Sequence, residues 1–238
     1  MFFDSHRRIV LALLAALSVL AGCGGGGAGL PDPRLRFVNA CSDSTSLGLT
    51  VDDEPVLTSQ ALFGISDVGT VDTGERDVTL VESSPTSQLD ALVVTFTNDT
   101  DTLIAAVGLE NYGAEPLKRA QLAVTKINTQ APNGTKARLI VIQGFNRASG
   151  LNTPQVDFKN PGDNPQYVLS NIDPAAIRSF DVDSGSQTFG VYRTGTSTEY
   201  IAPSALTLEA GKIYLVMLTG VEGETGTLTP AMTLTAIN

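Results

Sequence analysis

The sequence contains an internal repeat, and this feature limits the possible folds more than any other. Residues 101–128 align without a gap with residues 211–238, at an offset of 110. Two shorter matches lie upstream, Asp72-Thr73-Gly74 with Asp183-Ser184-Gly185 and Val51-Asp52 with Val156-Asp157, at offsets of 111 and 105. Changes in loop length between homologous strands produce small drifts of this kind. The sequence therefore predicts two related units of about 100 residues, an ordinary domain size, joined across residues 129–135.

The hydrophobic pattern from residue 34 onward is typical of β-strands. Leu47, Leu49 and Val51 alternate with polar or small residues, which indicates strands with one buried face. The runs 103–107 and 213–218 are apolar throughout, and this predicts strands buried on both faces. Turn-forming residues separate the runs. The pattern predicts an all-β fold of two tandem immunoglobulin-like antiparallel β-sandwich domains, over residues 34–130 and 136–238. A single large barrel is the structural alternative.

The first 22 residues have the form of a lipoprotein signal peptide. Arg7 and Arg8 precede the uncharged run from Ile9 to Leu20, which is too short to span about 30 Å of hydrocarbon as a helix. The residues that follow, Leu20-Ala21-Gly22-Cys23, resemble the lipobox of bacterial lipoproteins. This resemblance implies cleavage before Cys23 and lipidation of that cysteine.

A glycine-rich tether follows Cys23. Residues 23–33 are predicted to be the lipidated cysteine and a flexible linker, because a run of glycines cannot pack a core. Several acyl chains hold a protein durably on a bilayer, so the expected membrane contact is the lipid anchor. Gly24 stands where an aspartate marks retention at the inner membrane in Gram-negative sorting. By this resemblance the expected location is the outer membrane, at its periplasmic face or at the cell surface.

Removal of residues 1–22 also removes His6, the one histidine of the chain. The processed protein then has no imidazole for a Ser-His-Asp or Cys-His site and none for zinc. The net charge of -10 argues against a nucleic-acid partner, because binding to the phosphate backbone requires clustered Lys and Arg. Cys41 would remain as an unpaired thiol. It follows a strand-like run and is expected to be a buried small hydrophobe.

Carboxylates are the plentiful reactive groups. A glycosidase needs two of them about 5–9.5 Å apart across a cleft, and the candidates are Asp52, Asp53, Glu54, Asp99, Asp101, Asp181 and Asp183. Each lies at a strand end or turn, where aspartates stay solvated, so no catalytic residue is predicted. The turn Asn98-Asp99-Thr100-Asp101 supplies too few oxygen ligands for calcium, and no metal site or cofactor is predicted. Aromatic residues for sugar stacking are limited to Tyr167, Tyr192 and Tyr200, which are more simply interpreted as closing the second sandwich.

Four segments resemble the bacterial domain-of-unknown-function 4397 (DUF4397) family, which often occurs in tandem. They are the opening strand 34–40, the strand 47–53, the segment 72–81 and the segment 206–216, which contains Ala210-Gly211-Lys212-Ile213-Tyr214. Family members often carry a histidine near the end of the opening strand. This chain has Asn39 there and Gln143 or Gly144 in the second copy. The family has no assigned activity, so the resemblance implies the fold alone.

The leading functional hypothesis is a non-enzymatic cell-envelope lipoprotein. It would be a binding or structural module that presents loops or sheet edges to a protein or glycan partner. The alternatives are a carboxylate-dependent hydrolase of envelope polysaccharide and a calcium-dependent adhesion module.

Overall fold

A computed structural model describes residues 30–82, 87–111, 119–147 and 155–237. The expected signal peptide, Cys23 and the tether up to residue 29 lie outside these residues. Residues Asp32–Asn238 form one compact unit. A search of the described residues finds no helix with the length and apolar character needed to cross a bilayer.

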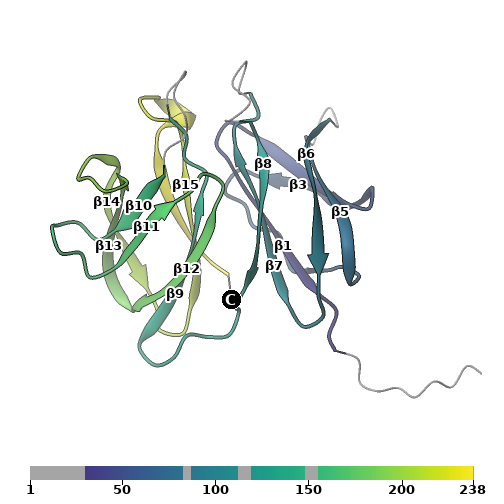
Figure 1. Cartoon of the computed structure of the whole chain (residues 1–238), viewed down its shortest axis with the longest axis horizontal. Coiled ribbons are helices and arrows are strands. Elements are labelled where there is room, and N and C mark those ends of the chain that lie inside the picture. Colours follow the sequence, from purple (N-terminus) through teal and green to yellow (C-terminus); the bar gives the residue numbers. More distant parts are fainter. Residues whose placement is uncertain (1–29, 83–86, 112–118, 148–154, 238) are drawn as a thin grey trace, which may run out of the picture. The chain divides into compact units, whose positions relative to one another are not determined.

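The first sandwich consists of two four-stranded sheets, with strand orders β4-β1-β7-β8 and β3-β2-β5-β6 (Figure 1). Its strands are β1 (Arg34–Cys41), β2 (Ser46–Val51), β3 (Glu54–Ala61), β4 (Gly69–Thr70), β5 (Gly74–Glu82), β6 (Gln88–Phe96), β7 (Asp101–Gly108) and β8 (Gln121–Ile127). Strands β3 and β4 therefore each form an edge of their sheet.

The second sandwich repeats this topology, with strand orders β12-β9-β15-β16 and β11-β10-β13-β14. Its strands are β9 (Lys136–Gln143), β10 (Val156–Lys159), β11 (Val168–Ile172), β12 (Ile177–Asp183), β13 (Gly185–Arg193), β14 (Glu199–Leu208), β15 (Ile213–Thr219) and β16 (Ala231–Ala236), with a 3-10 turn at Gly226–Leu228. Each strand has its counterpart eight positions earlier in the order. The predicted all-β fold of two tandem sandwiches is confirmed.

The structure confirms one of the three repeat matches in full. Strands β7 and β8 correspond to β15 and β16, but Ile104 lies opposite Val124 whereas Tyr214 lies opposite Ala236, so the gapless match of 101–128 with 211–238 is wrong by two residues in one of the two strands. Gly108 and Gly220, which both have positive φ, assign the shift to β7 and β15, at an offset of 112. Strands β5 and β13 both begin at a glycine with positive φ, Gly74 at 110° and Gly185 at 103°, as the offset of 111 requires. Glycine is suited to both positions because side chains rarely adopt such a φ.

The third match, Val51-Asp52 with Val156-Asp157, is wrong. Leu47 lies opposite Glu82 of β5, and Val156 lies opposite Arg193 of β13. Glu82 and Arg193 end the two equivalent strands, so Val156 corresponds to Leu47 and not to Val51. A Val-Asp pair is too short to specify register, and the loops that precede β2 and β10 differ in length.

One pair of strands in each sandwich is parallel, which the expectation of antiparallel sheets did not include. Strand β1 runs parallel to β7, from Arg34 opposite Asp101 to Cys41 opposite Gly108. Strand β9 pairs in the same way with β15. The other pairings between the described strands are antiparallel. Alternation along a strand shows which face is buried but not the direction of the neighbouring strand.

Three apolar clusters make up the core. One lies within each sandwich, and the third joins residues of both. Strand β7 contributes side chains to two of these clusters. Ile104 belongs to the core of the first sandwich, whereas Leu103 and Ala105 belong to the third cluster, which we call the shared layer. Alternate side chains of a strand point to opposite faces, so a strand between two apolar layers is apolar throughout. The predicted burial of both faces of 103–107 and 213–218 is confirmed.

A candidate binding groove in the first sandwich

The two sandwiches differ at one edge. In the second sandwich, β12 pairs with β9 over seven consecutive residues, from Ile177 opposite Ile142 to Asp183 opposite Lys136. In the first, the equivalent β4 has two paired residues, with Gly69 opposite Leu35 and Thr70 opposite Arg34. In the first sandwich, a regular strand therefore covers this edge of the sheet over two residues, compared with seven in the second.

The chain before β4 bulges away from β1. The N–H of Ser66 donates to the carbonyl of Phe37 at 2.8 Å, and the next pairing joins Gly69 to Leu35. From Ser66 to Gly69 this segment advances by three residues, whereas β1 advances by two, from Phe37 to Leu35. One extra residue on one strand is the mark of a β-bulge. Asp67 and Val68 form the bulged part, and Val68 is 42% exposed.

Gly69 stands where the second sandwich has Phe180. The offset of 111 that relates the start of β5 to that of β13 also relates Val71 to Val182 and Gly69 to Phe180. Val71 and Val182 are both core residues, and Phe180 packs against the core of the second sandwich. A Cβ built on Gly69 would meet no atom within 4 Å, and the backbone there lies outside the left-handed region. The first sandwich therefore has open space where the second has an aromatic side chain packed against its core.

This space is part of a groove of about 580 Å³ between β3 and the segment that contains β4. Leu35 and Phe37 of β1 line it from the core, Val56 and Leu57 from β3, and Ile65 and Val68 from the opposite wall. Val56 is 43% exposed. The size and apolar lining are those of a ligand-binding site, and apolar side chains at the rim of a groove mark surfaces that partners cover. We call this feature the β3 groove.

One end of the β3 groove is acidic. A second cavity of about 300 Å³ shares Val56, Thr70 and Val71 with the groove. Its charged lining consists of Asp32, Asp52, Glu54, Asp72 and Arg76. Four carboxylates face one guanidinium, so this acidic end has an excess of negative charge.

Arg76 is already engaged at this end. Its guanidinium lies 3.0 Å from the Asp52 carboxylate and 3.7 Å from that of Asp72. The other Asp52 oxygen accepts the N–H of Asp77. Within the described residues Asp32 and Glu54 make no ion pair and are exposed, so their charges are available to a ligand.

The carboxylates considered from the sequence do not meet in one site. Asp52 and Glu54 line the acidic end of the β3 groove, and Asp53 is exposed in the same turn. Asp99 lies in the turn before β7, and Asp101 pairs with Arg34 at 2.7 Å. Asp181 and Asp183 lie on β12, where they pair with Arg138 and Lys136 at 2.8 and 2.6 Å.

The pKa shifts also differ from those of a catalytic pair. The hydrogen bond from Lys136 and then that from Tyr167 lower the pKa of Asp183, whereas a general acid needs a raised one. Among the described carboxylates the raised pKa belongs to Glu110, where burial is the main cause and the charges of Glu82 and Asp43 add to it. Glu110 was not singled out from the sequence. Within the described residues no group of three acidic, cysteine or histidine side chains could hold a metal ion.

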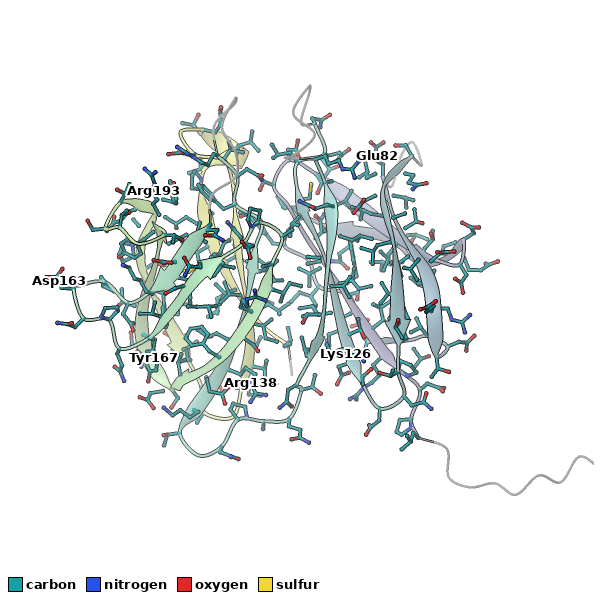
Figure 2. All side chains as sticks on the ribbon, viewed as in Figure 1. Glu82, Lys126, Arg138, Asp163, Tyr167 and Arg193 are labelled. Carbon is teal, nitrogen blue, oxygen red and sulfur yellow. The ribbon has the colours of Figure 1, made fainter. Side chains whose placement is uncertain are left out.

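The tyrosines have structural contacts in the second sandwich, where Figure 2 labels Tyr167. The Tyr167 hydroxyl donates to the Asp183 carboxylate and accepts the N–H of the same residue at 3.0 Å. The Lys159 ammonium lies 4.7 Å from the ring centroid of Tyr192. Tyr200 packs against Phe145 with ring centroids 5.1 Å apart. These contacts fit the interpretation that the tyrosines close the sandwich.

The polar residues at the end of the opening strands hold the backbone. Asn39 is fully buried; its amide donates to the Gln60 carbonyl of β3 and its oxygen accepts the N–H of Cys41. The Gln143 oxygen accepts the N–H of Phe145 in the second copy, and Gly144 follows it. The predicted burial of Cys41 is confirmed, and this burial is the main cause of a raised thiol pKa. The thiol therefore stays protonated and inert near neutral pH.

The β3 groove was not predicted from the sequence. Its sequence signal is Gly69 in place of Phe180 of the second copy, and the meaning of that difference is readable only once the pairing of β4 is known.

Comparisons with known proteins place the chain in no family. No family model matches it, and no curated protein matches it. Among solved structures, the chain is 10% identical to the Bacillus anthracis TIE protein, with a TM-score of 0.24 over 76% of this chain and 32% of that one. It spans about a third of the length of that protein.

Two further structures are of similar length. A "putative cell adhesion protein" from Parabacteroides distasonis is 10% identical, with a TM-score of 0.26, 88% of this chain covered and 99% of that one. Another from Bacteroides eggerthii is 12% identical, with a TM-score of 0.24, 89% of this chain covered and 97% of that one.

Proposed function

We propose that this protein is a non-enzymatic, lipid-anchored module of the bacterial cell envelope that binds a partner protein in the β3 groove. The observation that carries the proposal is the open space at Gly69, where the second copy of the same fold has Phe180 packed against its core. A fold that repeats its topology strand by strand but leaves one copy open keeps apolar surface accessible. A partner that covers Val56 and Val68 would bury this surface.

The anchor part of the proposal rests on Cys23 and the lipobox-like residues before it. The tether of residues 23–33 would keep the sandwiches close to the outer membrane while leaving them free to reorient, because glycine-rich linkers behave as flexible coils. The periplasmic face and the cell surface are both compatible with this arrangement.

Replacement of Cys23 by serine should abolish lipidation. Because the lipid is attached to the cysteine sulfur, Cys23→Ser cells grown with radiolabelled palmitate should yield an unlabelled protein that keeps residues 1–22. Gel autoradiography and intact-mass measurement check this result. Cys41→Ser is the matched control, since that thiol is buried, and it should be labelled like the native protein. A native protein without label, or a labelled Cys23→Ser protein, would contradict the anchor.

A photo-reactive diazirine amino acid at Val68 should cross-link an envelope protein in living cells. Val68 lines the β3 groove and is half-exposed, so a bound partner would lie within contact of its side chain. The same amino acid at Val93 of β6, which is 61% exposed and does not line the groove, is the control. Gel shift and mass spectrometry of the adduct read the result.

Adding Gly69→Phe to the Val68 probe should abolish the adduct, because the new ring occupies the groove without backbone strain. A protein adduct specific to Val68 and lost with Gly69→Phe supports the proposed function. Absence of an adduct, or equal adducts at Val68 and Val93, counts against it.

A further inference from the structure

We propose that the β3 groove takes an extended peptide strand that lies along β3, with apolar side chains in the groove and a Lys or Arg at the acidic end. This inference rests on the proposed function and names the chemistry of the partner. Three features of the structure support it: the position of β3 at the edge of its sheet, the aromatic side chain that the first sandwich lacks, and the charge at one end of the groove.

Strand β3 is the edge of its sheet and borders the groove along its length. An edge strand presents backbone N–H and C=O groups on its outer side, and peptides bind such edges by adding a strand. Gln60 and Val56 line the groove, and Glu54 lines its acidic end. At about 3.3 Å per residue, Glu54 to Gln60 spans about 20 Å, the length of a peptide of six or seven residues.

The second sandwich shows which side chain would fill the groove. There β12 brings Phe180 toward the core, 6.2 Å from both Phe158 and Phe189, measured between ring centroids. In the first sandwich the equivalent position is Gly69, next to the bulge that contains Val68. An added strand with an aromatic side chain would replace what Phe180 supplies in the second copy.

The negative charge at the acidic end of the groove favours a basic residue at the end of the peptide that binds there. Arg76 engages Asp52 and Asp72, which leaves Asp32 and Glu54 without an ion pair within the described part of the chain. A basic side chain that reaches this end would be attracted by the excess of carboxylates, and an acidic one would be repelled. This favours a basic, apolar peptide over a neutral amphiphile, which would gain nothing from the carboxylates.

The experiment uses residues 30–238 of the protein, because Asp32–Asn238 form a compact unit. The probes are two fluorescent peptides of alternating threonine and valine with one phenylalanine, one with two lysines at its C-terminus and one with two lysines at its N-terminus. Binding is measured by fluorescence anisotropy. At least one peptide should bind, and replacement of its lysines by glutamates should weaken the affinity about tenfold or more.

Three variants locate the binding. Gly69→Phe should weaken binding about tenfold or more, because it fills the groove. Glu54→Gln/Asp72→Asn should weaken it about threefold to tenfold by removing charge at the acidic end. The matched control is Asp163→Asn/Glu224→Gln, which changes the net charge equally on loops of the second sandwich and should leave the affinity unchanged. Figure 2 labels Asp163.

Each outcome has one meaning. Binding that Gly69→Phe and the charge variant weaken supports the inference. Failure of both lysine peptides to bind, or binding that Gly69→Phe leaves unchanged, overturns it. Neutral Nile red serves as a second probe. If Nile red binds, Gly69→Phe removes its binding and neither peptide binds, the occupant of the groove would be a small apolar ligand in place of a peptide. A Val68 cross-link to a protein, together with failed peptide binding, would leave the proposed function standing and remove only the inference about peptide chemistry.

Discussion

Replacing Phe158 by alanine should lower the free energy of unfolding by about 3–5 kcal/mol. Phe158 is fully buried at the centre of the second sandwich, where its ring stacks on Phe189 with centroids 4.6 Å apart and an interplanar angle of 11°. Phe180 packs against it edge-on. The substitution removes buried apolar surface and leaves a cavity that these rigid neighbours cannot fill, and it also removes two aromatic contacts.

Urea unfolding followed by tyrosine fluorescence measures the effect of Phe158→Ala. Four of the five tyrosines, Tyr167, Tyr192, Tyr200 and Tyr214, lie in the second sandwich, so their fluorescence mainly reports its unfolding. Phe158→Leu is the matched control; it keeps much of the volume and should lose about half as much stability or less. A loss below about 1 kcal/mol for Phe158→Ala would show that the aromatic cluster does not determine the stability of this sandwich.

Replacing Leu215 by aspartate should separate the unfolding of the two sandwiches. Leu215 is fully buried in the shared layer and does not belong to the core of either sandwich. An unpaired buried carboxylate costs about 3–5 kcal/mol. The layer can avoid this cost only by opening to water, and the packing that links the two sandwiches is then lost.

Comparison of two probes tests this separation. Far-ultraviolet circular dichroism reports both sandwiches, whereas tyrosine fluorescence mainly reports the second. In the native protein the two urea curves should coincide, and in Leu215→Asp they should separate. Leu215→Met, which conserves volume, should lose less than about 1.5 kcal/mol and keep the curves together. Coincident curves in Leu215→Asp would mean that the shared layer does not link the two sandwiches.

The strands could be predicted from the sequence because their residues report burial directly. Residues 103–107 are apolar at every position, and each side chain is buried in one of two layers. The match of 101–128 with 211–238 identified the last two strands of each sandwich as equivalent, although their register differs by two residues. The pairing of β1 with β7 could not be predicted, because a strand has the same pattern beside a parallel or an antiparallel neighbour.

The β3 groove depends on missing side chains, and missing side chains leave little signal in a sequence. Gly69 reads as a turn residue until its place opposite Leu35 is known, and β4 is too short to specify that register. Glu54 was considered as half of a catalytic pair because of its residue type. Its position at the end of an apolar groove, opposite Asp72 and Arg76, follows only from the packing of three strands.

The parallel pairing of β1 with β7 has a consequence for the order of events during synthesis. Arg34 and Asp101 are 67 residues apart in the chain, so the first strand has no partner in β7 until most of the first sandwich has emerged. Contacts between such distant residues form late and slow the folding of a domain. The export that we propose would require an extended chain, and this delay would give it time to cross the membrane. We expect newly made protein to be cut by proteases until β7 is complete.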